Sequence, residues 1–186
     1  MAMPALVPRY TAREIRDFPD DRLRYEVIRG ELFVTPAPGL GHQRTVLELA
    51  VLFRDYLERN ALGEVLVAPF EVELTEDSAV QPDVLVILAD RSSHLTRKRL
   101  MGAPSLAVEV ISYTSKRTDR LQKRRLYQDE GVPEYWVVDP ELRRVERWRP
   151  GDEVPEVLTE RLVWRATPEV TALEIDLVTL FARVWR

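Results

Sequence analysis

The sequence predicts an α/β sandwich, in which a central sheet has helices on both faces. The segments EVLVAPFEVEL at 64–74, VLVIL at 84–88, LAVEVI at 106–111 and YWVV at 135–138 indicate strands, and the last three lack the polar alternation of a half-exposed strand. Helices are predicted at 42–60 and 115–130. The core order is therefore helix, strand, strand, strand, helix, strand, which is typical of an α/β sandwich.

Shorter elements are predicted on either side of this core. Thr11 and Glu14 have capping-box spacing and begin a short helix, and YEVIRGELFV at 25–34 reads as two strands around Arg29-Gly30. The apolar spacing of 42–60 is helical, and the segment 35–41 before it is a loop. Segments 142–148 and 157–164 indicate a hairpin around 150–152, and Asp176 caps a last helix that runs to Trp185. We expect one domain over 1–186, with extra β-hairpins at both ends.

Composition excludes several classes of protein. The 186 residues are 45% hydrophobic, which does not fit a disordered chain, and no apolar run approaches the ~20 residues of a membrane span. The absence of Cys excludes disulfide scaffolds and thiolate sites. We expect a cytoplasmic protein without membrane association. The excess of Arg over Lys and the scarcity of Asn suit a thermophile, although a GC-rich genome gives the same Arg excess.

The net charge of −4 conceals an uneven distribution. The segment 91–125 holds ten basic and two acidic side chains, a net charge of +8, so the remaining residues carry −12. A basic segment of this kind indicates an acidic partner such as nucleic acid. We expect it to surround the functional site, because it includes Glu109 and Lys123.

Elimination leaves carboxylates as the candidate reactive groups. The sequence has two His, no G-x-S-x-G motif and no glycine-rich nucleotide loop. Asp83 immediately precedes one apolar run and Glu109 interrupts another, and a carboxylate buried in a strand costs several kcal/mol unless it is paired, protonated or bound to a cation. If the strands are neighbours, both acids can bind one Mg²⁺ or Mn²⁺ ion. The alternative is structural: Asp83 caps a strand and Glu109 pairs with an Arg.

The order Pro82-Asp83, Glu109 and a helix with Lys123 and Tyr127 resembles the PD-(D/E)XK nuclease superfamily. More specifically, the chain is similar to the Uma-type restriction endonucleases, which are expanded in cyanobacteria. The resemblance spans roughly 11–180, and GVPEYWVVDP at 131–140 is its most specific part. The other residues that carry it are YEVIRG at 25–30, His42, Gln81-Pro82-Asp83, Glu109-Val110-Ile111-Ser112, Asp119, Lys123 and Tyr127.

The sequence departs from the superfamily pattern at one position. The motif has Lys two residues after the strand acid, where this chain has Ile111. The resemblance implies that the lysine has moved to the following helix, where Lys123 is the candidate and Lys116 the alternative. Only Lys, not Arg, shifts its pKa readily on burial. A structural role for Lys123 is also open, as an i,i+4 pair with Asp119.

The resemblance implies a restriction-endonuclease-like fold and metal-assisted hydrolysis of DNA. Asp83, Glu109 and the Val110 carbonyl would hold Mg²⁺ or Mn²⁺, and Lys123 would orient the attacking water. It also implies secondary roles for Glu26, His42, Gln81, Asp119 and Tyr127. The basic segment would bind backbone phosphates, above all through Lys116, Arg117, Arg120 and Arg124. A homodimer, or a higher homo-oligomer, is expected by analogy with the two-fold symmetry of duplex DNA.

Two alternatives come from other classes. A catalytically degenerate domain of the same fold would bind nucleic acid without cutting it, and the missing strand lysine leaves this open. A protein-interaction or assembly domain would use the basic face to hold an acidic partner. Salt-sensitive DNA binding without cleavage would identify the first, and a protein partner without DNA binding the second.

Overall fold

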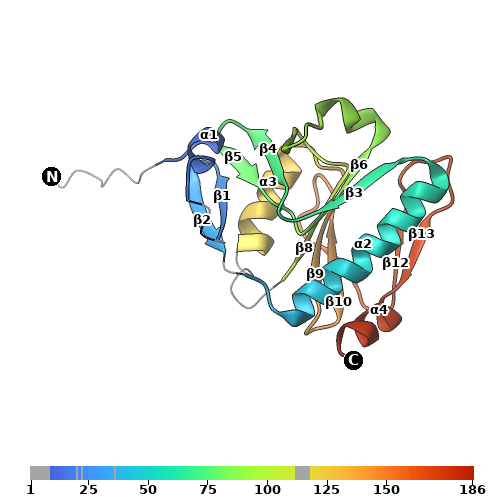
Figure 1. The fold of residues 1–186 in the computed structure, drawn as a ribbon. Helices are drawn as coiled ribbons and strands as arrows, with labels where there is room; N and C mark the ends of the chain where they lie inside the picture. The colour runs from blue at the N-terminus through green and yellow to red at the C-terminus, as the bar shows by residue number, and fades with distance from the viewer. Residues whose placement is uncertain (1–8, 20, 22, 36, 112–117) are drawn as a thin grey trace.

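A six-stranded mixed sheet forms the centre of the molecule (Figure 1). The computed structural model describes residues 9–19, 21, 23–35, 37–111 and 118–186, with the backbone alone for 118–120. The strand order is β11-β10-β9-β8-β6-β3; β8 and β9 are parallel, and the other neighbours are antiparallel. The strands are β3 (Gly63–Val67), β6 (Val84–Leu88), β8 (Leu106–Val110), β9 (Tyr135–Asp139), β10 (Arg144–Trp148) and β11 (Glu156–Leu158).

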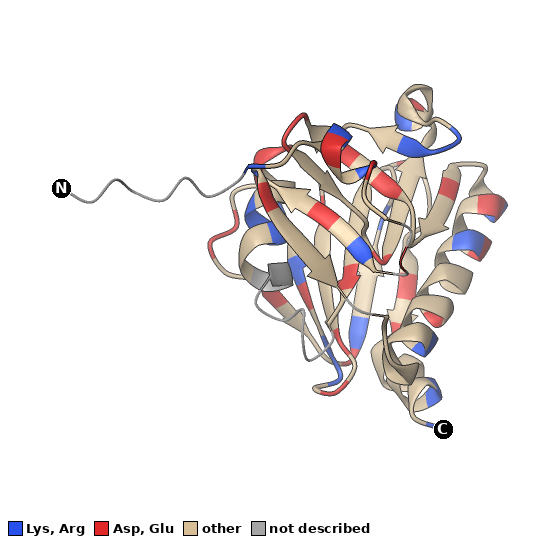
Figure 2. Ribbon diagram, turned by 60° about the vertical axis from the view of Figure 1, so that its left-hand side comes forward, with Lys and Arg blue, Asp and Glu red and all other residues tan. Residues whose placement is uncertain are grey.

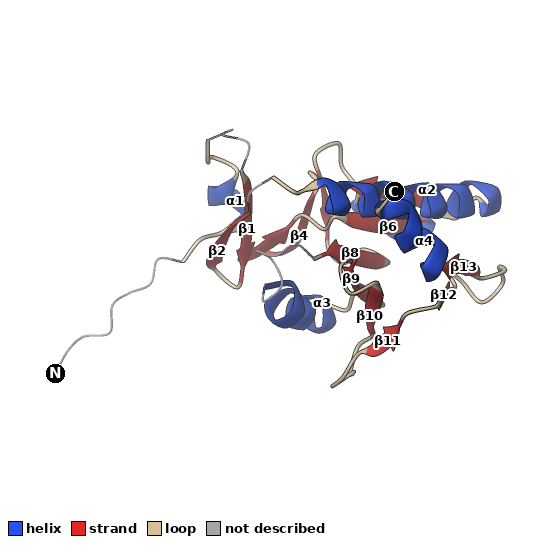
Figure 3. Cartoon of the chain, turned by 90° about the horizontal axis from the view of Figure 1, so that it is seen from below, coloured by secondary structure: helices blue, strands red, loops and turns tan. Residues whose placement is uncertain are grey.

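Helices cover both faces of this sheet, as the sequence predicts (Figure 3). One face carries α2 (Leu40–Asn60) and α4 (Leu177–Val184), and the other carries η2 (Thr118–Lys123), a π-helical turn, followed by α3 (Arg124–Asp129). Phe53 of α2 and Phe181 of α4 join Trp136 in the core on the first side. Leu126 and Tyr127 of α3 pack in a separate core on the second side. The α/β sandwich is confirmed, and α2 begins two residues before its predicted start.

A second sheet extends the N-terminal side. Its order is β2-β1-β5-β4-β7, formed by β1 (Arg24–Ile28), β2 (Glu31–Thr35), β4 (Glu71–Thr75), β5 (Ser78–Val80) and β7 (Arg99–Met101). The predicted hairpin around Arg29 and Gly30 is confirmed, and both turn residues have positive φ, of 52° and 81°. The prediction of one strand over 64–74 is wrong. The chain breaks near Pro69, whose nitrogen cannot donate to a strand ladder, so β3 and β4 belong to different sheets.

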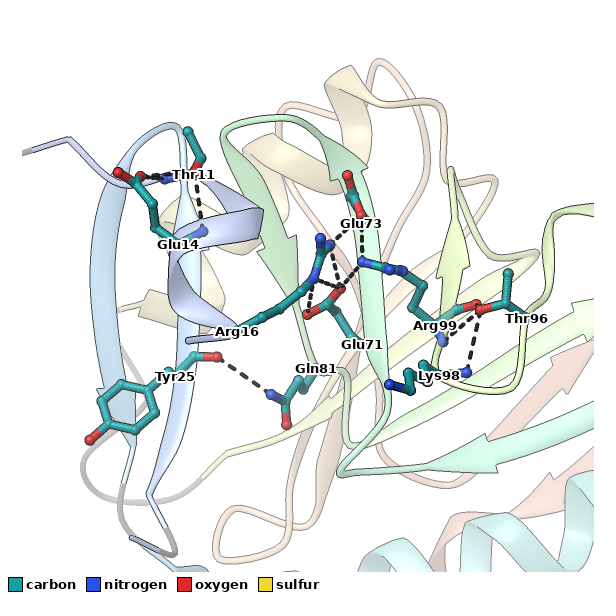
Figure 4. A network of polar contacts seen from close by, with 10 residues as sticks. All are labelled: Thr11, Glu14, Arg16, Tyr25, Glu71, Glu73, Gln81, Thr96, Lys98 and Arg99. Carbon is teal, nitrogen blue, oxygen red and sulfur yellow. Dashed lines mark hydrogen bonds and ion pairs between the residues drawn. The ribbon is translucent and has the colours of Figure 1, made fainter. Parts of the chain in front are cut away.

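The short helix α1 (Ala12–Ile15) lies beside this second sheet. Its predicted capping box is present: the Thr11 hydroxyl accepts from the Glu14 amide, and the Glu14 carboxylate accepts from the Thr11 amide. Just after it, the Arg16 guanidinium pairs with Glu71 and Glu73 of β4 (Figure 4). These contacts tie the N-terminal helix to the sheet.

The C-terminal strands agree only in part with the prediction. The hairpin around 150–152 is formed by β10 and β11, while β12 (Arg161–Trp164) pairs with β13 (Leu173–Asp176), a strand the sequence analysis did not predict. The predicted single strand over 157–164 is therefore wrong, because its two halves pair with different partners. The Asp176 cap is confirmed, since its carboxylate accepts from the Thr179 amide at 2.9 Å and α4 begins at the next residue.

Among the described residues of the basic segment, not every cation lies near Glu109. Arg91 belongs to η1 (Ala89–His94), a 3₁₀ helix that follows β6, whereas Asp83 precedes that strand. Arg99 pairs with Glu71 and Glu73, and basic and acidic residues are interspersed along the ribbon (Figure 2). The expectation that positive charge of this segment surrounds the site is wrong for Arg91, because strand direction places it beyond the opposite end of β6 from Asp83.

The predicted helix over 115–130 is observed from Thr118 to Asp129, and its first predicted residues fall outside the described part of the chain. Among the described helices, none combines the length and apolar character needed to cross a bilayer.

Candidate functional site

Asp83 and Glu109 lie on one side of the central sheet. Strands β6 and β8 are antiparallel neighbours with Val84 opposite Val108, so the register brings position 83 beside position 109. The alternating side chains confirm the shared face: Leu85 and Ile87 pack in the same core cluster as Ala107 and Ile111. The predicted convergence of the two acids therefore follows from strand pairing.

The Asp83 carboxylate is almost completely buried and has partners at both oxygens. Oδ1 accepts from Arg24 Nη1 at 2.9 Å, and Oδ2 accepts from the Val110 backbone amide at 2.8 Å. His42 Nε2, at the start of α2, lies 2.9 Å from Oδ2. Burial raises the pKa of Asp83, but the hydrogen bond and charge of His42 and the charges of Arg24 and Lys123 outweigh it and lower the pKa below its ordinary value. Asp83 is therefore an ionised carboxylate at neutral pH.

Glu109 is held from the other side by the helical segment. Lys123 Nζ donates to Glu109 Oε1 at 2.8 Å and to Glu26 Oε1 at 2.9 Å, and the Tyr127 hydroxyl donates to Glu109 Oε1 at 3.1 Å. Lys123, Glu26 and Glu109 are each about 2% exposed. A buried cation between two buried carboxylates satisfies charges that would each be costly alone.

Local periodicity explains why these side chains meet. Lys123 and Tyr127 are four residues apart along the helical segment, so they share one face. In β1, Arg24 and Glu26 are two residues apart and point to the same side of the strand. The resemblance indicated Glu26 but not Arg24. The strand period was the signal that could have found Arg24.

Gln81 connects the second sheet to the site. Its backbone amide donates to Glu26 Oε1 at 2.6 Å, and its backbone carbonyl accepts from Arg24 Nη1 at 3.0 Å. The side-chain amide reaches the Tyr25 carbonyl at 3.4 Å (Figure 4). The segment before β6 is thus fixed to β1 at three points.

Two more pKa values reflect the concentration of carboxylates. Burial raises the pKa of Tyr127 well above its usual range, and the negative charges of Glu109 and Glu26 add to the effect. Burial lowers the pKa of Arg24, but the carboxylates of Asp83, Glu109 and Glu26 outweigh it and raise the pKa. Tyr127 therefore remains a hydrogen-bond donor and Arg24 a cation at any ordinary pH.

The structure describes the surroundings of some residues for which a purely structural role was considered, and not of others. Glu109 Oε1 accepts from Lys123 and Tyr127, and its expected pairing with an Arg stays a prediction. Ile111 is 4% exposed in an apolar cluster, so its strand position supplies no cation. Lys116 and the side chain of Asp119 lie outside the described residues, and their roles stay predictions.

Of the four residues predicted above all to contact nucleic acid, Arg124 is the one whose side chain the structure describes. The Arg124 guanidinium lies over the Trp148 indole ring, 4.7 Å from the ring centroid. This places Arg124 against β10 rather than beside Asp83. Lys116, Arg117 and the side chain of Arg120 lie outside the described part of the structure, so their predicted contact with DNA stays a prediction.

The donor set fits a hard divalent cation. Asp83 and Glu109 offer carboxylate oxygens, and the hydrogen bond from the Val110 amide holds Asp83 beside the residue whose carbonyl is the predicted third ligand. Oxygen donors of this kind suit Mg²⁺ or Mn²⁺. Within the described residues, no three His, Cys, Asp or Glu side chains form a metal-binding group. The side chains alone therefore do not complete a coordination shell, and backbone and water oxygens would be needed.

Comparison with known proteins gives a family and a fold. A family model described as "Putative restriction endonuclease" (Uma2) matches residues 12–178. A crystal structure titled as a putative nuclease belonging to DUF820 from Anabaena variabilis superposes with a TM-score of 0.78 at 18% sequence identity, covering 94% of this chain and 99% of that one. No curated protein matches the chain. The similarity in structure confirms the restriction-endonuclease-like fold, and the family match over most of its length shows that the chain belongs to the Uma2 family.

Proposed function

We propose that the protein is a DNA endonuclease that uses Mg²⁺ or Mn²⁺ to hydrolyse phosphodiester bonds. Asp83, Glu109 and the Val110 carbonyl would hold the cation. When bound, the cation would polarise the scissile phosphate and lower the pKa of a water molecule. Membership of a family described as restriction endonucleases supports the reaction class.

One observation carries the proposal. The Val110 amide donates to Asp83 Oδ2 at 2.8 Å, which brings an ionised buried carboxylate to the peptide that follows Glu109. A purely structural strand cap does not require a second buried carboxylate and a buried lysine beside it. Maintaining three buried acids, Glu26, Asp83 and Glu109, in one place is costly. Such clusters of buried charges are typical of functional sites.

The surrounding residues have distinct roles in this proposal. Lys123, fixed 2.8 Å from Glu109 Oε1, would orient the attacking water and offset negative charge that develops on the phosphate oxygens. Tyr127 remains protonated and holds the Glu109 carboxylate in place. Lys123 thereby takes the role that the strand lysine has elsewhere in the superfamily, which explains how an active enzyme can have Ile111.

The test is cleavage of plasmid DNA with Mg²⁺ or Mn²⁺. Asp83→Asn and Glu109→Gln should each lower the rate at least about a hundredfold, because each removes a charged ligand whose loss costs several kcal/mol of transition-state stabilisation. Asp90→Asn is the matched control, since Asp90 is an exposed acid just beyond the opposite end of β6. Cleavage that survives Asp83→Asn unchanged would overturn the proposed site.

The remaining outcomes identify the alternatives. Salt-sensitive DNA binding without cleavage in either metal would indicate a degenerate nucleic-acid-binding domain. No DNA binding near physiological salt, together with a stable acidic protein partner, would indicate an interaction domain. The predicted homodimer is tested separately by light scattering of the protein with and without duplex DNA.

A further inference from the structure

A pocket of about 410 Å³ opens beside Asp83 and is not accounted for by metal binding. Its walls come from segments far apart in the sequence: β1 and the segment after β2, the start of α2, and the loop after β3. The volume is at the lower end of the ~300–1,000 Å³ range of small-molecule sites. It is large enough for a ligand, and it adjoins the candidate reaction centre.

The lining has apolar walls and a polar, basic floor. Leu23, Pro38, Val46 and Pro69 supply apolar surface around the pocket. At the floor, Arg24 and His42 both contact the Asp83 carboxylate. Apolar surface suits the faces of a planar ring, and a guanidinium suits a phosphate.

Two floor residues also carry polar atoms without a partner. His42 Nδ1 and Gln81 Oε1 are buried, and neither has a hydrogen bond within the described part of the chain. Buried polar atoms without partners are rare in folded proteins. Because both residues line the pocket, a ligand with donors and acceptors along one edge could supply the missing hydrogen bonds.

We propose that this pocket binds one unpaired nucleotide of the substrate strand, next to the scissile phosphate. The base would lie between the apolar walls with its edge toward Gln81 and His42, and Arg24 would contact a phosphate oxygen. A base paired in a duplex has its Watson–Crick edge occupied and cannot leave its stack without cost. The protein should therefore prefer single-stranded or locally unpaired DNA. The inference rests on the proposed function for the identity of the neighbouring phosphate.

The experiment measures binding without metal, so that it does not depend on cleavage. The probe is a short fluorescein-labelled single strand in EDTA, and the variant is Val46→Trp, which fills the pocket from α2. Its Kd should rise about tenfold, as expected for loss of one base contact. The matched control is Leu47→Trp: Leu47 is the next residue of α2, is 63% exposed and does not line the pocket, so its Kd should change less than about twofold.

Further measurements separate loss of the pocket from loss of folding. Val46 also packs against the core, so thermal melting checks folding, and Ala37→Trp in the exposed loop fills the pocket if Val46→Trp does not fold. The same strand annealed to its complement should bind wild type more weakly than the single strand. Equal affinities of the Val46 or Ala37 variant and the Leu47 variant, or equal binding of single strand and duplex, would overturn the proposal. If Val46→Trp or Ala37→Trp weakens binding but the wild-type protein does not cleave DNA, the nucleotide pocket is supported and only the proposed hydrolysis is refuted.

Discussion

Lys123→Met tests the buried charge cluster at its centre. Met has nearly the length and volume of Lys, so the substitution removes the ammonium group without opening a large cavity. Lys123 Nζ lies 2.8 Å from Glu109 Oε1 and 2.9 Å from Glu26 Oε1, and all three side chains are about 2% exposed. The variant therefore leaves two carboxylates buried without their shared cation.

The expected loss of stability is large. Removing one partner of a buried ion pair costs about 3–5 kcal/mol, because the remaining charge stays desolvated. For a domain of this size each kcal/mol changes the Tm by about 2–4 °C, so the melting temperature should fall by roughly 6–20 °C. Lys98→Met is the matched control: Lys98 is exposed, and its loss should change stability by no more than about 0.5 kcal/mol.

A second substitution separates stability from catalysis. Adding Glu26→Gln to Lys123→Met removes one of the two carboxylates that Lys123 pairs in the wild type, and should recover about 0.5–3 kcal/mol by coupling between neighbours. Cleavage should not recover, because the water-orienting cation is still absent. Calorimetry and plasmid cleavage measure the two effects. A Tm within about 2 °C of wild type would refute the described cluster, and recovery of cleavage in the double variant would refute a catalytic role for Lys123.

Three other substitutions follow from the contacts described. Arg24→Gln should tighten Mn²⁺ binding about tenfold by calorimetry, because a cation that competes for Asp83 Oδ1 is gone; unchanged affinity would argue against a metal at Asp83. Phe53→Ala should cost about 3–5 kcal/mol in denaturant unfolding, because Phe53 is fully buried against Trp136, and a loss below about 1 kcal/mol would contradict that packing. Hydrogen bonds from Arg147 lower the pKa of Glu156 in the folded protein. The pair therefore stabilises the fold at pH values above the unfolded pKa, near 4.5. This stabilisation is lost as the pH falls through the lower pKa of the folded state. Since Glu156 is largely exposed, Glu156→Gln should remove only a few tenths of a kcal/mol at neutral pH and nothing in acid.

The sequence predicted that Asp83 and Glu109 share one face of the sheet, but it did not predict all of the residues that surround them. Strand parity put Asp83 and Glu109 on the same face, and neighbouring pairing of β6 and β8 confirms it. The alternation of side chains predicts the face correctly here, because successive residues of a strand point to opposite faces and burial fixes the register of the strand. The same rule applied to β1 places Arg24 on the same face as Glu26.

Local sequence patterns could not predict which strands pair when they lie far apart in the chain. Strand β5 pairs with β1, and β4 pairs in parallel with the short β7, so these two contacts depend on segments far apart in the chain. Periodicity predicts that a segment is a strand but not which sheet it joins. Pro69 within 64–74 was a local signal of a break, because proline interrupts a strand ladder.

The folded structure also changes what the basic segment predicts about DNA binding. Two of its ten basic side chains are paired with carboxylates inside the chain: Arg99 with Glu71 and Glu73, and Lys123 with Glu26 and Glu109. At most eight remain for phosphates. Because each neutralised phosphate contributes about −0.9 to the slope of log K against log salt for duplex DNA, this segment can supply a slope no steeper than about −7.

A salt titration of duplex binding by wild type and by Arg99→Gln measures this contribution. The slope should be the same for both proteins, because Arg99 is already paired with carboxylates. If wild type shows a slope near the −9 that ten contacts would give, and Arg99→Gln makes it shallower by about one, then the ion pairs with β4 open on binding and the segment acts as a single phosphate-binding surface. The net charge of a sequence segment thus sets only an upper limit on the phosphates it can neutralise, and intramolecular pairing lowers that limit.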